Sequence, residues 1–456
     1  MRKMGRLVCW ATTLGAIGMS GCAADTPPAP APADQPVTVT FLRHDNPSFR
    51  QADDEFFADY KAAHPNVTIA DTTVTYTVLD ATLLGDLRGD RFAYDLVMIP
   101  PPRLCGFANN LLDVPADVIA PAQAEATFFP PPLQGATCGG KLKALPVEYN
   151  LEYGGVVVNV DKYQAKFPGK TPGWPDWSSF VTEAAALTEY DDLGRPMANG
   201  LDIDPDWPAP VISILLSQIL QRGGEYWGPT GDLFDFNTPA ARDSLAEMVS
   251  WVNKSRVMDR SLVPDKNTSV SARLASGATG YGWSDPLKPL SVIGYVGTWG
   301  LPSVRGQVPP GSGWHYEWHA LPPMVGPEHK FVSTGGWAFA VPKTSKNPKV
   351  AWDIARSLAL SPAAARKWSA VSGTLPALRA NGSPEAAAGD PVLAQVQPLL
   401  AHGRFRGYIP VAAIKTAQGA FGTNFFAAAA GTKTVEQALA DIQKTANDAI
   451  EQNRDP

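Results

Sequence analysis

The sequence predicts an α/β protein whose globular body is divided into two lobes. Segments with the alternation of a strand are followed by segments with helical periodicity, beginning with residues 37–42 and 53–63. Strands that alternate with helices favour a layered α/β fold with a largely parallel sheet. The body after Pro36 has 420 residues, which is more than one hydrophobic core usually serves. Two lobes are therefore the expected organisation.

Local sequence patterns predict the strands of the first half of the body. The strand-like segments of the first half are 37–42, 67–69, 74–78, 94–99 and 156–158. They are rich in β-branched and apolar residues, as strands usually are.

Helix starts in the second half have a visible cause. Thr238, Asn347 and Ser361 each place a capping side chain directly before a proline, and proline is well suited to the first helical position. Thr434 with Gln437 predicts a capping box for the last helix.

The first 22 residues predict an export signal. Three basic residues precede an apolar stretch at 7–19, which is too short to span a bilayer comfortably as a helix. The sequence at 19–22 resembles a bacterial lipobox, so we expect Cys22 to be lipidated in the mature protein. Ordinary cleavage nearby, or Cys22 as a disulfide partner, is the alternative. Residues 23–36 are rich in proline and predict an extended tether.

The charge balance and the cysteines narrow the class of protein. The net charge is −6, and without the three basic signal residues 35 Lys and Arg face 44 Asp and Glu, which gives −9. A mildly acidic body without a basic stripe argues against nucleic acid as a partner. No later segment approaches 18 apolar residues, the length of a membrane-spanning helix.

Cys105 and Cys138 are the two cysteines of the body and predict one disulfide in an exported protein, with two buried free thiols as the alternative.

Several segments, taken in order, resemble the family 1 extracellular solute-binding proteins of ABC importers, the group that includes maltose-binding protein. The most specific is Gly335-Gly336-Trp337-Ala-Phe-Ala-Val-Pro342, which runs on to Asn347-Pro348. The others are 141–146 with 158–163, 177–180, 234–240, 275–280 and 373–376.

The resemblance implies a fold, partners and a location. The fold is the periplasmic-binding-protein fold, with two lobes joined by strands that cross more than once and a ligand cleft between them. We place one lobe at 37–146 plus 321–378 and the other at 147–320 plus 379–456. The expected partners are a small sugar-like ligand, the importer's membrane subunits and a membrane reached through the lipid anchor. The protein would be an exported monomer without a cofactor.

A sugar site needs flat aromatic surfaces and polar groups that bind vicinal hydroxyls. Many of the 13 tryptophans stand in loops beside Gly, Pro or Asp. For each of these tryptophans core packing is the alternative. The aromatic candidates and their neighbours are Trp207, Trp227, Trp283 with Asp285, and Trp337 after Gly336.

Polar candidates come from the loops after strands, because ligands bind at the carboxyl ends of strands in open α/β sheets. A solvated surface is the alternative for each of these charged residues, and the two arginines would also suit an anionic ligand such as a glycerol phosphate. Which of the two glutamates faces the cleft is left open. The candidates are Arg43, His44, Asp45, Arg103, Glu148, Tyr149, Glu152 and Tyr408.

Catalytic signatures are missing or incomplete. There is no P-loop and no His-Glu-x-x-His helix, and the elbow-like sequence 282–286 ends in proline where a nucleophile elbow has glycine. His315, Glu317 and His319 share one face if they form a strand, so a metal is geometrically possible, but a hydrogen-bonded edge is far more common. We expect a binding protein without a metal. An exported glycoside-acting enzyme, which needs two carboxyls beside one bond, is the alternative.

Overall fold

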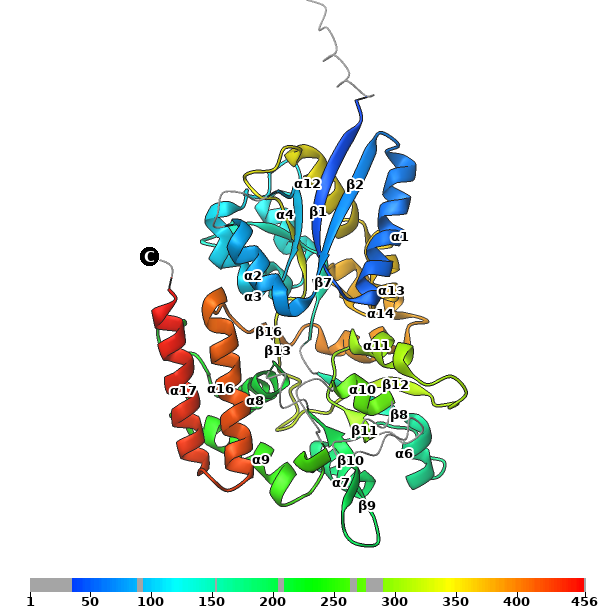
Figure 1. The fold of residues 1–456 in the computed structure, drawn as a ribbon, viewed down its shortest axis with the longest axis vertical. Helices are drawn as coiled ribbons and strands as arrows, with labels where there is room; N and C mark the ends of the chain where they lie inside the picture. Colours follow the sequence, from blue (N-terminus) through cyan, green and yellow to red (C-terminus); the bar gives the residue numbers. More distant parts are fainter. Residues whose placement is uncertain are drawn as a thin grey trace, which may run out of the picture. The chain divides into compact units, whose positions relative to one another are not determined.

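The computed structural model describes residues 35–87, 93–151, 154–203, 209–262, 269–275 and 290–454. The described residues of the unit Val37–Pro456 form two five-stranded sheets and two separate hydrophobic cores. We call the first sheet with its core lobe 1 and the second sheet with its core lobe 2 (Figure 1). The predicted α/β fold with two lobes is therefore confirmed.

The sheet of lobe 1 has the strand order β2-β1-β3-β14-β6. β1 pairs in parallel with both β2 and β3, whereas β14 runs antiparallel to β3 and β6. β1, β3 and β6 therefore end at the same edge of the sheet, and β14 begins there. The strands are β1 Val37–His44, β2 Val67–Val74, β3 Leu96–Ile99, β6 Ala144–Pro146 and β14 Ala338–Ala340.

Helices of lobe 1 pack on this sheet and fill its core. α1 begins earlier than predicted because Asn46 accepts hydrogen bonds from the backbone of Ser48 and Phe49, and Pro47 follows the cap. The strand expected at 74–78 is wrong: β2 ends at Val74 after pairing with β1 along its whole length, and a helix begins at Tyr76. The helices are α1 Pro47–Ala63, α2 Tyr76–Leu87, α3 Pro101–Leu104, η1 Cys105–Asn110, α4 Pro121–Thr127, α5 Pro130–Gly135, α12 Pro348–Ala359 and α13 Pro362–Ser372.

The sheet of lobe 2 has the strand order β12-β8-β11-β10-β9. β10 and β11 are parallel, and β8 runs antiparallel to both β11 and β12. β10, β11 and β12 therefore end at the edge where β8 begins. The strands are β8 Gly155–Asn159, β9 Glu189–Tyr190, β10 Pro196–Asp202, β11 Ser291–Gly294 and β12 Tyr316–Ala320.

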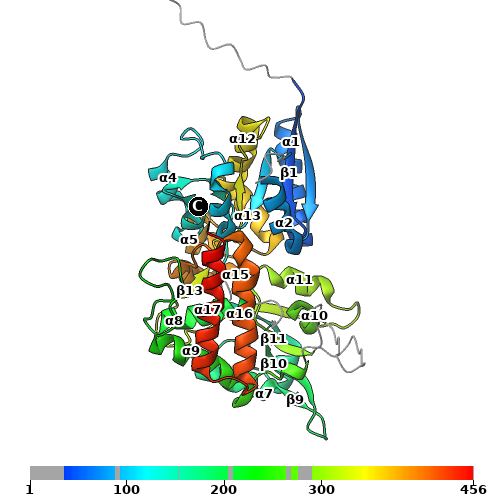
Figure 2. The same ribbon diagram turned by 60° about the vertical axis from the view of Figure 1, so that its left-hand side comes forward.

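Helices of lobe 2 include the pair α16 and α17, which run side by side in both views (Figures 1 and 2). The predicted caps at Thr238, Ser361 and Thr434 are confirmed. Asn347 makes no capping bond, and its side-chain NH2 group donates instead to the carbonyl of Thr38 and to Asp95. The helices are α6 Val160–Lys166, α7 Trp177–Leu187, α8 Ala209–Gln221, α9 Pro239–Asn253, η2 Arg260–Leu262, α10 Val270–Ala275, α11 Gly300–Gln307, α16 Val411–Ala429 and α17 Val435–Gln452.

Short strands and helices connect the two lobes. β7 Glu148–Tyr149 pairs with β15 Leu375–Pro376, and β13 Phe331–Ser333 pairs with β16 Gly403–Phe405. Phe331 and Val332 pack in the core of lobe 2 and Trp337 in that of lobe 1. The chain thus returns to lobe 1 later than residue 321, because β13 is held by β16 and by Ser217 of α8. The remaining elements are β4 Thr137–Cys138, β5 Lys141–Leu142, η3 Arg379–Gly382, α14 Pro384–Ala387, α15 Pro391–Val396 and η4 Gln397–Leu399.

A disulfide links Cys105 to Cys138 across 33 residues of lobe 1. It ties the end of α3 to the short hairpin β4–β5. Within the described residues, no helix combines the length and apolar character needed to cross a membrane. The predicted signal, Cys22 and the tether lie outside the described residues.

A fully buried ion pair holds two elements of lobe 2 together. Arg273 of α10 donates to both carboxylate oxygens of Asp202, at 2.6 and 3.1 Å, and Ser291 adds a third bond at 2.6 Å. Neither charged side chain has any solvent exposure. Removing one partner of such a pair leaves an uncompensated buried charge, which is far costlier than losing a surface pair.

We therefore predict that Asp202→Asn lowers the free energy of unfolding by about 3–5 kcal/mol. Urea denaturation followed by circular dichroism measures this change. Asp448→Asn serves as the control, since Asp448 pairs with Lys444 on the exposed face of α17, and it should leave the midpoint unchanged. Equal effects of the two substitutions would show that the buried pair has no special weight.

Candidate functional site

One edge of the lobe 1 sheet gathers the polar and aromatic candidates. β1 ends at His44, β3 leads into α3 with Arg103, β6 leads to Glu148, and β14 begins after Trp337. The strand directions place these four positions at the same edge. The crossing after β6 then runs to the start of β8, at the edge of the lobe 2 sheet where β10 and β11 end. The carboxyl edges of both sheets are thus joined by one short segment.

An aromatic cluster forms at this edge of lobe 1. The imidazole of His44 stacks on the indole of Trp337, with ring centroids 5.0 Å apart and planes inclined by 18°. Phe49 and Tyr76 each meet both of these rings edge to face. Trp337 is only 7% exposed, so His44 covers the indole face that the sequence offered to a ligand. Trp337 acts here as the support on which His44 rests.

The position of His44 keeps its ring neutral. Nδ1 is buried and has no hydrogen-bond partner among the described residues. The pKa of His44 is lowered to about 4, chiefly by burial; the negative charge of Asp45 opposes this shift and the positive charge of Arg103 adds to it. A neutral imidazole can donate from one nitrogen and accept at the other. Asp45 itself is exposed and pairs with Arg50 at 3.4 Å.

Arg103 is held by the first helix turns of α2. Its guanidinium donates to both carboxylate oxygens of Asp80 and to the hydroxyl of Tyr76 at 2.7 Å, and it lies 4.8 Å above the Tyr76 ring. The residue is 5% exposed. Sequence reasoning missed Tyr76 and Asp80 because residues 74–78 had the composition of a strand.

Arg43 forms ion pairs outside the aromatic cluster. It bonds Asp71 at 2.8 Å and Asp54 at 2.8 Å, with Asp53 at 3.7 Å. Successive residues of a strand point to opposite faces, so Arg43 points away from the face that His44 shares with Trp337. Arg43 therefore belongs to an ion network with α1 and β2 and lies outside the aromatic cluster.

The crossing segment lies directly on the Gly335-Gly336 pair. Gly336 has a φ of +90°, and a Cβ there would lie 2.5 Å from the carbonyl oxygen of Glu148. The carbonyl of Trp337 accepts from the backbone of Val147 at 2.9 Å. The Glu148 side chain is buried beside these contacts. This close approach fixes where the chain leaves lobe 1.

The two other candidate residues on the crossing segment are Tyr149 and Glu152. Tyr149 is fully buried and its hydroxyl donates to the carbonyl of Leu400 at 2.9 Å, and burial raises its pKa. With no exposed surface, Tyr149 serves as core packing in this structure, and we leave it out of the site. Glu152 lies outside the described residues.

Lobe 2 contributes Trp299, which lies beyond the carboxyl end of β11. Trp299 follows β11, is half-buried and packs partly against both cores. A Cβ on Gly297 would lie 2.4 Å from its indole nitrogen, so this glycine admits the ring. Sequence reasoning missed Trp299, although a tryptophan flanked by glycines after a short apolar strand is a signal of the same kind as at Trp337. Trp207, Trp283 and Asp285 lie outside the described residues.

Trp227 and Tyr408 are held by other contacts. Trp227 stacks on Phe234 with ring centroids 4.2 Å apart, and its indole nitrogen donates to the carbonyl of Arg406 at 2.9 Å. The Tyr408 hydroxyl lies against Gly106, where a Cβ would be 2.6 Å from it. Both residues sit near the junction of the lobes, on the α16 side.

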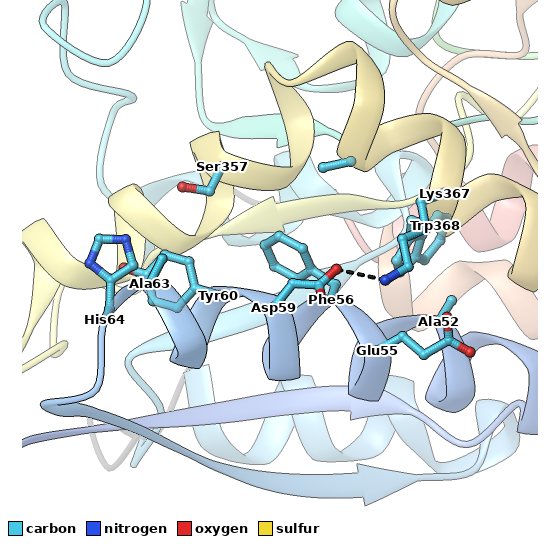
Figure 3. A pocket seen from close by; sticks show the side chains of 11 residues that line it. Ala52, Glu55, Phe56, Asp59, Tyr60, Ala63, His64, Ser357, Lys367 and Trp368 are labelled. Carbon is cyan, nitrogen blue, oxygen red and sulfur yellow. Dashed lines mark hydrogen bonds and ion pairs between the residues drawn. The ribbon is translucent and has the colours of Figure 1, made fainter.

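Two other features could have formed a site. A crevice of about 230 Å³ between α1, α12 and α13 is crossed by the ion pair of Lys367 and Asp59 (Figure 3), and no predicted site residue lines it. On β12, Glu317 lies 3.0 Å from His319 and 3.6 Å from His315. Across the described ranges, no group of three or more His, Cys, Asp and Glu residues is arranged to hold a metal ion.

Comparison with known proteins identifies the type of fold and the family model that it matches. The model of the bacterial extracellular solute-binding proteins matches residues 55–394. The sugar-binding protein MalE of Xanthomonas citri is similar over 91% of this chain and 98% of its own, with a TM-score of 0.69 and 15% identity. Maltose-bound MalE3 of T. maritima covers 90% and 98%, with a TM-score of 0.67 and 16% identity.

A third solved structure is the GacH receptor of Streptomyces glaucescens, described both unliganded and with acarbose. It covers 91% of this chain and 99% of its own, with a TM-score of 0.70 and 15% identity. No curated protein sequence matches the chain significantly. At these identities the solved structures show the fold alone.

The pKa of His44 gives a prediction for stability against pH. A histidine whose pKa falls on folding contributes stability above its unfolded pKa near 6.5, and this stability is lost as the pH falls toward 4. Between pH 7 and pH 5 the protein should lose about 1–2 kcal/mol more than His44→Gln does. Urea denaturation of both proteins at the two pH values measures the difference. Parallel losses would contradict a neutral His44.

Proposed function

Because the chain belongs to the bacterial extracellular solute-binding proteins, we propose that it captures a neutral carbohydrate and delivers it to the membrane subunits of an ABC importer. The observation that carries the choice of ligand is the state of Arg103. Its guanidinium is buried and chelated by the carboxylate of Asp80. A cation that is already paired in this way offers hydrogen bonds but no net charge to a ligand.

An anionic ligand is disfavoured for the same reason. The sequence left a glycerol phosphate open because two arginines stood at strand ends. Arg43 is surrounded by Asp53, Asp54 and Asp71, and Arg103 is paired with Asp80. A phosphate would have to displace a carboxylate from one of them, and it would then meet that displaced negative charge.

A carbohydrate matches the aromatic and neutral polar groups near the carboxyl edges of the two sheets. A sugar ring presents apolar C–H faces and hydroxyls that both donate and accept, so it needs aromatic surfaces beside neutral or paired polar groups. His44 and Tyr76 supply these in lobe 1, and Trp299 supplies an indole from lobe 2. The fold is shared with MalE3 of T. maritima, which is bound to maltose, and with the receptor GacH, which is described with acarbose. These likenesses support the same ligand class here.

Binding would work by closure of the two lobes. α1 contacts α11, and α2 contacts α16, so helices of lobe 1 and lobe 2 meet on two sides of the crossing. A ligand that touches His44 and Trp299 together binds the closed arrangement better than an open one and shifts the population toward it. The paired strands β7–β15 and β13–β16 would act as the hinge. No chemistry on the ligand is required, and we propose binding and release in place of glycoside cleavage.

The proposed location and lipid anchor rest on the sequence of the first 36 residues. We propose that Cys22 carries a lipid, that the proline-rich tether holds the body outside the membrane, and that the protein works there as a monomer. These features agree with the extracellular character of the family.

The ligand class is tested by thermal shift. We expect maltose or another neutral oligosaccharide to raise the melting temperature, since a ligand at a hundred times its Kd stabilises the fold by about 2.7 kcal/mol. Glycerol 3-phosphate should give no shift. In Asp80→Asn the Arg103 charge is released, and a shift with glycerol 3-phosphate should appear. If the unsubstituted protein responds to the phosphate and to no sugar, the proposed ligand class is wrong.

Trp299 is tested by substitution. Trp299→Ala should weaken sugar binding tenfold or more, because truncating a central aromatic contact commonly costs at least ~1.4 kcal/mol. Isothermal titration calorimetry measures the affinity. Trp314→Ala is the matched control, since Trp314 is also half-buried in lobe 2 but precedes β12, at the opposite edge of the sheet. Undiminished affinity in Trp299→Ala would remove this residue from the site.

A further inference from the structure

A second polar hollow lies where lobe 1 meets lobe 2 on the side of β16. Its volume is about 700 Å³. It is bounded by α5, by the loop between α8 and α9, and by the segment that includes β16. Its lining includes Gln134, Glu225, Trp227, Asp235, Arg404 and Phe405. None of these residues belongs to the aromatic cluster or to the pair of Arg103 and Asp80.

Trp227 forms a rigid aromatic wall of this hollow. One face of its indole is stacked on Phe234 with an interplanar angle of 14°, and Nε1 donates to the carbonyl of Arg406. Gly407 lies so close that a Cβ there would be 2.7 Å from Nε1. The indole is therefore fixed before any ligand arrives, and its half-exposed remainder faces the hollow. Pre-ordered aromatic surface costs little conformational entropy on binding.

The polar groups of the hollow are of the kind that bind hydroxyls. Glu225 and Arg404 form an exposed ion pair at 2.6 Å. One carboxylate oxygen of Asp235 accepts from the backbone of Asn237 at 3.0 Å, and the other has no partner among the described residues. The exposed amide of Gln134 likewise has none there. The lining holds two carboxylates and one guanidinium, and the positive charge of Lys330 also acts on Glu225. The charges therefore balance, which suits a neutral polyol.

A packed layer separates the hollow from Arg103. A Cβ on Gly135 would lie 2.6 Å from Cβ of Pro101 and 3.0 Å from Cε2 of Phe405. Pro101 begins the helix α3 that carries Arg103, and Phe405 lines the hollow. The side chains around Gly135 thus close the hollow on the side that faces α3.

We propose that this hollow is a second carbohydrate site, with Trp227 as its aromatic surface and with Gln134 and Asp235 as hydroxyl-binding groups. It takes its ligand class from the proposed function but is a separate site. Because it is open to solvent and offers a single indole, it binds maltose more weakly than the site between His44 and Trp299. Sequence analysis predicted that Trp227 binds a ligand, and in this proposal it does so in the hollow.

The test is ¹⁹F NMR of the protein with all tryptophans replaced by 5-fluorotryptophan, titrated with maltose. Trp227→Phe and Trp299→Phe assign the two resonances. We expect the Trp299 resonance to move first and the Trp227 resonance to move at concentrations at least tenfold higher. In the double variant Gln134→Ala/Asp235→Ala the Trp227 response should weaken at least tenfold while that of Trp299 is unchanged. Asp232→Ala, in the same loop but paired with Arg454 outside the hollow, is the control and should change neither.

The outcomes separate this inference from the proposed function. A Trp227 resonance that stays still while Trp299 moves overturns the second site alone. The second site is also overturned if both resonances move together and the double variant has no effect, because Trp227 would then report closure of the lobes. Movement of Trp227 alone supports the hollow and counts against the site at Trp299. If neither moves, both proposals fail for this sugar.

Discussion

The contact between Gly336 and the backbone of Glu148 is the constraint on which the site of lobe 1 depends. No side chain fits between these two segments, and the backbone of Gly336 adopts a positive φ that other residues rarely reach. The contact places the crossing segment against the start of β14. It thereby fixes Trp337, which supports His44, at the point where the chain leaves for lobe 2. The ligand surface and the hinge are therefore built from the same few residues.

Three arginine side chains of this molecule are buried and paired, whereas some of its aromatic rings remain partly exposed. Arg43, Arg103 and Arg273 are all buried, and each is bonded to at least one carboxylate. Pairing of this kind fixes geometry while leaving little net field in the space between the lobes. The aromatic rings, in contrast, stay partly open: Trp299 is half-buried, and His44 lies above Trp337 with its ring neutral. The proposed preference for uncharged ligands rests on this division.

The fold and one edge of the site could be predicted from sequence because they depend on strand order alone. His44 and Arg103 were placed correctly at strand ends, since parallel strands bring their carboxyl ends together whatever the details of packing. Arg43 could not be separated from His44 without knowing which face of β1 each occupies. Tyr76 and Asp80 were hidden because a segment rich in Val, Thr and Tyr has the composition of a strand even where it begins a helix. Trp299 stands between two glycines in the sequence, but its position beyond a central strand follows only from the pairing of β11 with β8 and β10.

The disulfide between Cys105 and Cys138 has a consequence for when the protein becomes competent. Cys105 follows the helix of Arg103 directly, and Cys138 follows α5, so the link closes the segment that forms one wall of the lobe 1 site. Thiols remain reduced in the cytosol and are oxidised outside it. In an extracellular solute-binding protein this wall is consequently locked only in the oxidising compartment where the protein works, and the same segment stays unlinked as long as its thiols are reduced.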